Sequence, residues 1–331
     1  YGVKHGNMKK YNWGIIGPGK IARKFTIGLK QLENANLYSV VSRSKERAED
    51  FAKEYSYKKS YGDYLQFASD PELDIVYVAT PHSHHHEHTL LCLKNGKAVL
   101  CEKPFAVNSS QVDEMINSAM ENNLFLMEAL WPPFQPSYIK AGELISKGAC
   151  GQVEYINSRF SFKAPYEPKL RTFNPDLAGG SLLDIGIYPV IDALTFIGKP
   201  DSIETSVVFA GTGVDESTGI LFGYKDGRGA SLYSSFANDG GPCTDLICEN
   251  ANIRISRGWD YTQYLSIEYG NGEKEEYTYK PDAKGFHYEA AEVMRCLDKQ
   301  LKESPVVPLA FSRELIRTLD RIRKKAGIIY A

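Results

Sequence analysis

The sequence has no excess of positive charge and no long apolar run. Its 331 residues carry 39 Lys and Arg against 41 Asp and Glu, a formal net charge of −2. Because a nucleic-acid-binding surface needs cations to neutralise phosphates, this balance argues against nucleic acid as a partner. No apolar run approaches the roughly 20 residues that cross a bilayer, and the N-terminus lacks the apolar region of a secretory signal. We therefore expect neither a nucleic-acid nor a membrane partner.

The sequence also lacks any C-x-x-C pair. Its six cysteines are scattered, which in a chain of this length is typical of buried thiols in a reducing compartment. Cys243 and Cys248 are five residues apart, a spacing that directs them to opposite faces of a strand and argues against a disulfide. We expect a cytoplasmic protein.

What the sequence does have is an ordinary globular composition and two different patterns. The length predicts about two domains. From Asn12 to about Leu130, short apolar runs alternate with amphipathic helical stretches, which predicts a doubly wound parallel sheet of the Rossmann type. The strands of this half are expected at 13–16, 37–41, 75–79, 98–101 and 124–127.

Beyond about Cys150, eight alternating runs separated by polar turns predict a large, open, mostly antiparallel sheet, faced by a helix over 181–197. We expect a nucleotide-binding α/β domain over 8–130 and an α+β domain for substrate and dimerisation over 131–331. The last helix is expected to pack back on the first domain. Residues 1–7, before Met8, are interpreted as a tag remnant and excluded.

The clearest motif is Gly17-Pro-Gly19-Lys20-Ile21-Ala22, which fits G-x-G-x-x-[GA] directly after the first strand. Glycine is needed there because the backbone must turn tightly and then approach a pyrophosphate, whose charge the free N–H groups of the helix N-terminus stabilise. A glycine-rich turn without a ligand is the alternative. The order of strand, turn, helix and second strand favours dinucleotide binding.

The end of the second strand bears on which dinucleotide binds. An NAD site usually offers Asp or Glu there to the ribose 2′-OH, whereas this chain has Ser42-Arg43-Ser44-Lys45. A hydroxyl, a guanidinium and an ammonium suit a 2′-phosphate. We expect NADP, with NAD as the alternative; the competing interpretation of Arg43 is a solvated, basic helix N-terminus.

Three further segments carry a family resemblance. They are Ala79-Thr80-Pro81-His82, Cys101-Glu102-Lys103-Pro104 and Gly179-Gly-Ser-Leu-Leu-Asp184-Ile-Gly-Ile-Tyr188-Pro189. Together with the glycine motif they resemble the glucose–fructose oxidoreductase / inositol dehydrogenase (Gfo/Idh/MocA) family over essentially the whole chain from Met8. The resemblance implies cofactor contacts from Gly17, Gly19, Lys20, Ile21, Ser42, Arg43, Thr80, Pro81, His82, Glu102 and Lys103.

Within that family, three details resemble the dimeric dihydrodiol dehydrogenases and the related NADP-dependent D-xylose dehydrogenases. They are Tyr188 where most members have histidine, Glu128-Ala-Leu-Trp131, and Gly285-Phe-His-Tyr-Glu-Ala290. The sequence departs from this subgroup at Pro132-Pro133, where the subgroup commonly has a Thr-Arg pair. This departure puts the pocket wall near Trp131 in question.

Oxidising an alcohol with a nicotinamide requires a group that removes the hydroxyl proton. Tyr188 is the candidate, and a nearby Lys103 would lower its phenol pKa and hold the substrate oxygen. Asp184, four residues earlier, would share its helix face and orient the substrate or keep Lys103 charged. The resemblance makes Trp131 an apolar wall; an ordinary core position is the alternative for it.

Further polar and aromatic residues lie between the second and third of the segments that carry the resemblance. Phe160, Phe162, Lys163 and Arg171 are candidates for the pocket lining, but for Lys163 and Arg171 we favour a solvated surface charge.

Five of the seven histidines lie close together: His82, His84, His85, His86 and His88. His84 and His88 have the i, i+4 spacing of a metal pair, but no third ligand has a matching spacing, so we expect no metal. His82 is expected near the nicotinamide ribose, and the others on the helix surface or in a packing contact.

The leading hypothesis is an NAD(P)-dependent dehydrogenase or reductase acting on the CH–OH group of a small sugar, polyol or dihydrodiol. The alternative is a non-catalytic nucleotide or sugar sensor on the same fold; a zinc-dependent hydrolase rests on the histidines alone. Because many residues on the outer face of the second sheet are apolar, we also expect a homodimer or higher homo-oligomer through that sheet.

Overall fold

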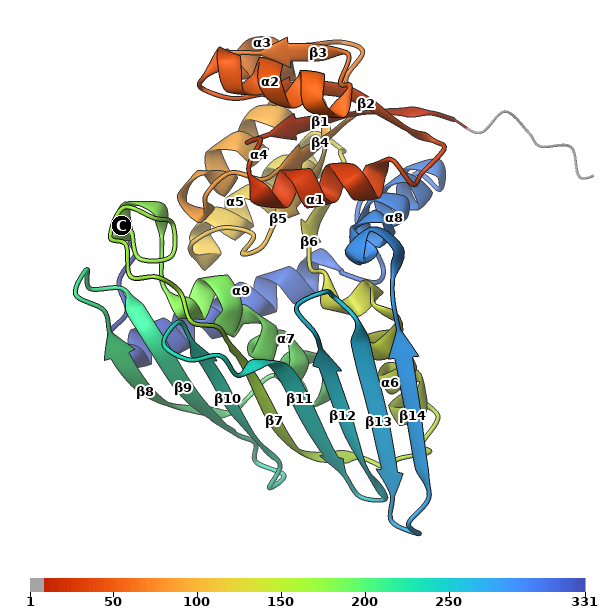
Figure 1. Cartoon of the computed structure of the whole chain (residues 1–331), viewed down its shortest axis with the longest axis vertical. Coiled ribbons are helices and arrows are strands. Elements are labelled where there is room, and N and C mark those ends of the chain that lie inside the picture. Colours follow the sequence, from red (N-terminus) through yellow and green to blue (C-terminus); the bar gives the residue numbers. More distant parts are fainter. Residues whose placement is uncertain (1–8, 331) are drawn as a thin grey trace, which may run out of the picture.

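Two β-sheets, each with its own helices, make up the protein (Figure 1). The computed structural model describes residues 9–330. The segment interpreted as a tag remnant therefore lies outside the described residues. The first half of the chain forms a six-stranded sheet and the second half an eight-stranded sheet, which confirms the predicted fold class.

The first sheet is entirely parallel, with strand order β3-β2-β1-β4-β5-β6. Its inner strands are apolar and buried on both faces, because helices cover each side. The strands are β1 (Tyr11–Ile16), β2 (Ala35–Val41), β3 (Lys59–Tyr61), β4 (Ile75–Val78), β5 (Ala98–Glu102) and β6 (Leu126–Ala129). The helices are α1 (Lys20–Leu29), α2 (Lys45–Tyr55), α3 (Tyr64–Ala68), α4 (His85–Lys94) and α5 (Ser109–Glu121).

The sequence placed the last strand of this sheet wrongly, at 124–127. Leu124 still belongs to the turn after α5, because its N–H donates to the carbonyl of Ala119 at 2.9 Å. Asn123 takes a positive φ of 53° there, which delays the extended backbone until Leu126. As a result Glu128 lies inside β6. The short β3 and α3 were not predicted, since neither has a clear apolar period.

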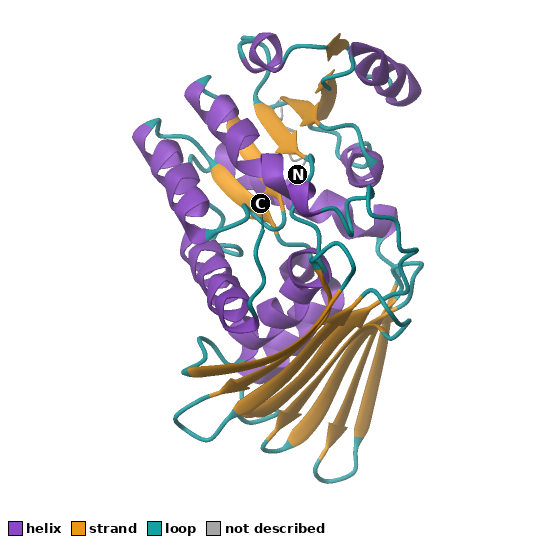
Figure 2. Cartoon of the chain, turned by 90° about the vertical axis from the view of Figure 1, so that its left-hand side faces the viewer, coloured by secondary structure: helices purple, strands orange, loops and turns teal. Residues whose placement is uncertain are grey.

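The second sheet has the order β14-β13-β12-β11-β7-β10-β9-β8 and is antiparallel except between β7 and β10. Its strands are β7 (Val153–Ser161), β8 (Ser202–Phe209), β9 (Asp215–Gly223), β10 (Gly229–Ser235), β11 (Gly241–Cys248), β12 (Ala251–Arg257), β13 (Gln263–Tyr269) and β14 (Lys274–Tyr279). Three helices pack on this sheet, α6 (Pro136–Ser146), α7 (Ile187–Phe196) and α9 (Leu309–Ala326), and they gather on one face, whereas the described residues leave the other face uncovered (Figure 2). The fourth helix of this half, α8 (Phe286–Asp298), packs instead against α1 of the first half.

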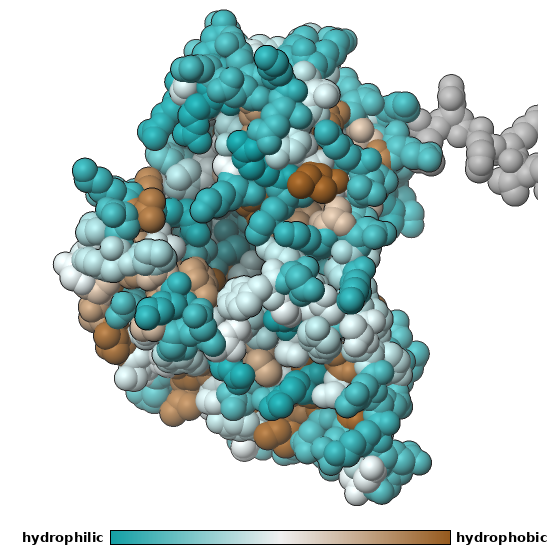
Figure 3. Space-filling model, in the orientation of Figure 1, coloured by the Kyte–Doolittle hydropathy of each residue, from teal (hydrophilic) through white to brown (hydrophobic). Residues whose placement is uncertain are grey.

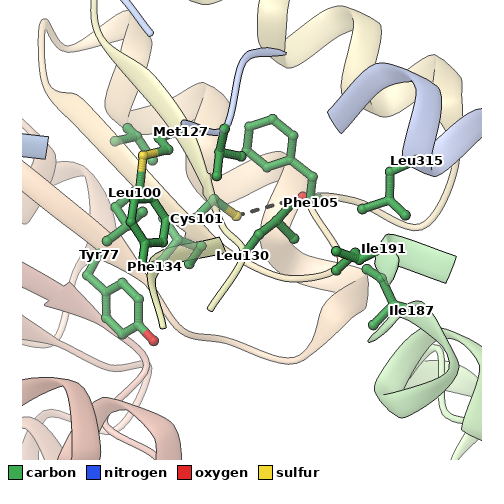
Figure 4. Packing of buried hydrophobic residues seen from close by; sticks show 14 of the residues in the cluster. Tyr77, Leu100, Cys101, Phe105, Met127, Leu130, Phe134, Ile187, Ile191 and Leu315 are labelled. Carbon is green, nitrogen blue, oxygen red and sulfur yellow. Dashed lines mark hydrogen bonds between the residues drawn. The ribbon is translucent and has the colours of Figure 1, made fainter. Parts of the chain in front are cut away.

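A continuous apolar core joins the two sheets. Leu130, just past β6, lies among Ile187 and Ile191 of α7 and Leu315 of α9 (Figure 4). The last helix, α9, packs against α5 and β6 as well as against β8. It therefore connects the two halves, as the sequence predicted.

The segment Pro175–Phe196 is long and apolar enough to cross a membrane by length and composition, contrary to our expectation that no run approaches this length. However, 89% of its most apolar window is buried inside the protein, where α7 packs on β7 and β10. This segment is the core helix of the second sheet, preceded by a π-helical turn, Leu182–Gly186.

All six cysteines are buried and free, as predicted. Cys243 and Cys248 both lie on β11 and form no bond with each other.

Candidate active site

A cavity of about 1020 Å³ opens between the two sheets. Figure 3 shows the hollow between the upper and lower halves of the molecule. The structure brings all of the predicted site residues to its wall: Gly17, Gly19, Lys20, Ile21, Ser42, Arg43, Thr80, Pro81, His82, Glu102, Lys103, Trp131, Asp184 and Tyr188. Residues separated by more than half of the chain thus meet at the carboxyl edge of the first sheet.

The glycine turn has the geometry that a pyrophosphate requires. Gly17 has a φ of 87°, and a Cβ added to it would lie 3.0 Å from the carbonyl of Ala79. Gly19 begins α1 without any side-chain cap, and a Cβ added to it would meet nothing closer than 3.9 Å. The first N–H groups of α1 are therefore free to bind an anion that approaches the backbone closely, so the residues fit a dinucleotide.

The end of β2 lies at the same cavity. Ser42 is buried, and its hydroxyl accepts a hydrogen bond from the Ser44 N–H at 3.3 Å. Ser44 in turn caps α2 by accepting from the Arg47 N–H. Arg43 is exposed, and Arg47, which we did not single out from the sequence, also lines the cavity. No carboxylate from this turn is among the lining residues.

Lys103 and Asp184 meet beside Tyr188. The Lys103 ammonium donates to the Asp184 carbonyl oxygen and lies 3.3 Å from the carboxylate oxygen Oδ1. The same ammonium lies 5.0 Å from the centre of the Tyr188 ring. Lys103 follows β5, whereas the other two residues lie in the π-helical turn and α7. The predicted triad therefore converges across the two sheets.

Arg171 completes this group, and our interpretation of it as a surface charge was wrong. Its guanidinium binds both carboxylate oxygens of Asp184, at 2.8 Å and 2.9 Å, although 43% of the Arg171 side chain is exposed. Such a two-point contact fixes the carboxylate more firmly than a single bond. Arg171 lies in a loop, where no periodic pattern could have indicated its partner. Phe160 and Phe162 line the cavity as predicted, but Lys163 is not among the lining residues.

Burial and neighbouring charges shift the pKa values of Asp184 and Tyr188. Burial alone would raise the pKa of Asp184, but the charges of Arg171 and Lys103 hold it well below its usual range. Burial raises the pKa of Tyr188, and the nearby Lys103 charge opposes that rise without overcoming it. We expected Lys103 to bring this pKa below its ordinary value; the net direction is upward, because desolvation of the phenolate is the larger effect.

The histidines do not converge. No group of three or more His, Cys, Asp or Glu side chains in residues 9–330 is arranged to hold a metal ion. His82 is buried and bonds the Ala178 carbonyl at 3.1 Å, which ties it to the loop before Asp184. His85, also buried, lies between the carbonyls of Thr80 and Pro104. The remaining three contact nearby side chains: His84 with Glu87, His86 with Glu114, and His88 with Thr80 and Tyr64.

Trp131 closes one end of the cavity. Its indole N–H donates to the Lys284 carbonyl at 3.1 Å, and its ring lies 5.9 Å from that of Tyr261 and 6.5 Å from that of Phe286. It is half-buried rather than a core residue. Its role as a wall beside the nicotinamide or substrate stays a prediction.

Glu128 of β6 is a buried carboxyl below the site. It is 2% exposed, accepts a hydrogen bond from the Phe105 N–H at 2.8 Å, and burial raises its pKa to about 7. A carboxyl whose pKa is raised on folding binds more protons in the folded state, so the protein loses stability as pH rises between the two pKa values.

We expect Glu128→Gln to remove this loss. Between about pH 5 and pH 8 the wild type should lose roughly 2–3 kcal/mol more of its free energy of unfolding than the variant, since each pKa unit corresponds to about 1.4 kcal/mol. Urea unfolding at both pH values measures the difference. Glu121→Gln, on the exposed end of α5, is the matched control; parallel curves for the wild type and Glu128→Gln would contradict the assignment.

Comparison with known proteins agrees with this geometry. Residues 11–130 match the family described as "Oxidoreductase family, NAD-binding Rossmann fold", and residues 138–254 match the "GFO/IDH/MocA C-terminal domain". The trans-1,2-dihydrobenzene-1,2-diol dehydrogenase of Mus musculus is 36% identical over 330 residues, covering 96% of this chain and 97% of that protein.

Two solved structures share the fold over nearly the whole chain. The aldose-aldose oxidoreductase of Caulobacter crescentus, complexed with glycerol, has a TM-score of 0.88 at 24% identity, covering 96% of this chain and 98% of that one. A levoglucosan dehydrogenase, in complex with NADH and levoglucosan, has a TM-score of 0.86 at 17% identity, covering 96% and 97%. The prediction of an NAD(P)-dependent dehydrogenase or reductase acting on CH–OH groups is confirmed. The chain belongs to the GFO/IDH/MocA family of oxidoreductases.

Proposed function

We propose that the protein interconverts an alcohol and a carbonyl group on a small sugar, polyol or dihydrodiol, with NADP as cofactor and Tyr188 and Lys103 as the proton-transfer pair. The observation that carries this proposal is the buried Lys103–Asp184–Arg171 network beside the Tyr188 ring, facing the glycine turn. When bound, the nicotinamide accepts or supplies the hydride.

Each member of the network has a distinct role in the proposed reaction. In the oxidative direction the Tyr188 phenolate takes the hydroxyl proton, while the C–H bond of the same carbon gives up its hydride. Lys103 holds the substrate oxygen and stabilises the phenolate. Asp184, held by Arg171, keeps Lys103 charged and in place. In the reductive direction Tyr188 returns the proton to the forming alkoxide.

The substrate class is proposed from relatives and from the lining of the cavity. The mouse relative is named for a dihydrodiol, and the two structures for an aldose and levoglucosan. Phe160, Phe162 and Trp131 provide apolar walls around the polar network. A panel of aldoses, polyols and dihydrodiols, together with sugar acids and sugar phosphates, assayed with both cofactors by nicotinamide absorbance, tests the proposal; no turnover with any of them would overturn it.

The preference for NADP is expected to depend on Arg43. Arg43→Ala should raise the Kd of NADPH by about 10-fold or more and leave that of NADH within about 2-fold, because a phosphate loses a charge-assisted partner and a 2′-OH does not. Fluorescence titration of the reduced cofactors measures both constants. Lys53→Ala, an exposed cation in the last turn of α2 and not among the cavity-lining residues, serves as the control. Equal losses for the two cofactors would remove the reason for preferring NADP.

We also propose a homodimer or higher homo-oligomer through the uncovered face of the second sheet. Large apolar side chains are exposed on β7, β8, β9, β11 and β13: Tyr155, Val208, Phe209, Leu221, Ile247 and Tyr264. A second copy would cover them, as the family resemblance implies. The six free, buried thiols support a cytoplasmic location. The proposed domain boundary lies between residues 130 and 131, after β6.

A further inference from the structure

Arg257 projects into the cavity from the last position of β12. Its guanidinium carbon lies 4.5 Å from the ring centre of Tyr261, 5.2 Å from that of Trp131 and 5.8 Å from that of Phe160. These three rings come from different elements and surround the side chain. The sequence analysis did not single this residue out, because a single arginine at a strand end has no distinguishing pattern.

Arg257 differs from Lys103 and Arg171, the two cations that contact Asp184, in having no acidic partner. Within residues 9–330, no hydrogen bond and no ion pair joins its side chain to another residue, whereas Arg171 binds Asp184 at two points. Aromatic faces attract a guanidinium, but they do not replace the acceptors that its N–H groups need in the plane of the group. Arg257 is half-buried in the cavity wall among three rings, and its unpaired N–H donors there indicate a ligand.

Arg257 lies between Tyr261, on the side of the predicted cofactor site, and Phe160, on the side of Tyr188. On the cofactor side, Lys24 of α1 donates to the Tyr261 hydroxyl at 2.6 Å, one turn after Lys20. On the other side, Phe160 links Arg257 to the proposed catalytic centre, since its ring lies 5.5 Å from that of Tyr188. Burial raises the pKa of Tyr188, and the Arg257 charge is one of those that oppose the rise. Arg257 is therefore close to where a substrate would react.

We propose that Arg257 binds an anionic group of the substrate, a carboxylate or a phosphate ester, and so selects sugar acids or sugar phosphates over neutral sugars. This inference rests on the proposed function. A carboxylate or phosphate would accept parallel N–H bonds from the guanidinium in a fixed geometry, while the three rings hold the arginine side chain. The anion thereby orients the substrate hydroxyl toward Tyr188 and Lys103.

The test compares Arg257→Gln with Arg254→Gln. Arg254 lies on the same strand but is exposed and paired with Asp245. Substrates are supplied as matched sets: D-glucose, D-gluconate, D-glucuronate and D-glucose 6-phosphate, with NADP or NADPH as the direction requires. We expect Arg257→Gln to lower kcat/KM for the anionic members by about 100-fold and for the neutral member by less than about 3-fold, because a charged partner is lost. Arg254→Gln should match the wild type.

Two results would overturn the proposal. One is a wild type that uses the neutral sugar as well as its anionic counterparts. The other is an equal loss for neutral and anionic members together with a raised Kd for NADPH, which would assign Arg257 to the cofactor. Comparison of kcat/KM for gluconate and glucuronate with kcat/KM for glucose 6-phosphate shows whether a carboxylate or a phosphate is preferred.

A binding measurement separates this inference from the proposed reaction. With saturating NADP present, gluconate or glucose 6-phosphate should raise the Tm of the wild type and not that of Arg257→Gln. A Tm shift without any turnover in the panel would overturn the proposed reaction and support the anion site. Turnover of neutral sugars without any Tm shift by anions would support the proposed reaction and overturn the anion site.

Discussion

Tyr188→Phe should lower kcat by about 10²–10⁴-fold, the usual contribution of a positioned acid or base, and leave the Kd of the cofactor unchanged. The hydroxyl is the only part of the side chain that is removed, so the ring keeps its contact with Phe160 at 5.5 Å. Single-turnover kinetics with a substrate found in the panel, together with NADPH titration, measure the two quantities.

A matched control for this variant is Tyr269→Phe, which removes a hydroxyl that bonds Glu275 on β14, away from the cavity. It should retain wild-type turnover. If Tyr188→Phe also retained wild-type turnover, Tyr188 could not be the proton carrier.

Lys103→Met should have an effect of comparable size and should also change the pH profile. Burial raises the pKa of Tyr188 and the Lys103 charge opposes this rise, so removing the charge leaves the pKa higher. Oxidation requires the phenolate, and its fraction falls tenfold for each pH unit below the pKa. The rising limb of kcat/KM for oxidation should therefore move to higher pH, in addition to a loss of about 10²–10⁴-fold at neutral pH.

The pH profile distinguishes the two roles proposed for Lys103. If Lys103→Met lowered the rate without moving the rising limb of the pH profile, Lys103 would only position the substrate and would not lower the pKa of Tyr188. Lys274→Met, an exposed lysine on β14, should leave both the rate and the profile unchanged.

The sequence predicted the fold well where its signals were local. The switch between apolar runs and amphipathic helices indicated every strand of the first sheet except the short β3, and the glycine motif placed Gly17 and Gly19 correctly at its edge. The eight alternating runs of the second half correspond to eight strands. The error of two residues at β6 arose because its apolar side chain makes Leu124 look like a strand residue, while the turn that precedes the strand has no strong sequence signature.

Only part of the site was predicted from the sequence. Arg171 and Arg257 were missed for the same reason. Lys103, Asp184 and Tyr188 belong to segments that resemble a known family, so their convergence could be expected. Arg171 lies in an irregular loop and Arg257 at the end of β12, and the partners of each come from elements distant in sequence. Their importance depends on tertiary contacts, which a single sequence does not display. The direction of the Tyr188 pKa was missed for a similar reason, since desolvation depends on how completely the cavity wall buries the phenol.

The position of β7 has a consequence for the way the chain must assemble. It is the first strand of its sheet to leave the ribosome, yet it lies at the centre, where Tyr155 pairs with Gly229 and Ser161 with Gly241. One edge of β7 therefore has no partner until synthesis has passed β10, and the other edge has none until synthesis has passed β11. Pairings this far apart in sequence are slow to form and leave strand edges open to wrong partners. The order of the strands thus leaves the central strand of the second sheet open to wrong pairing while the rest of that sheet is being synthesised.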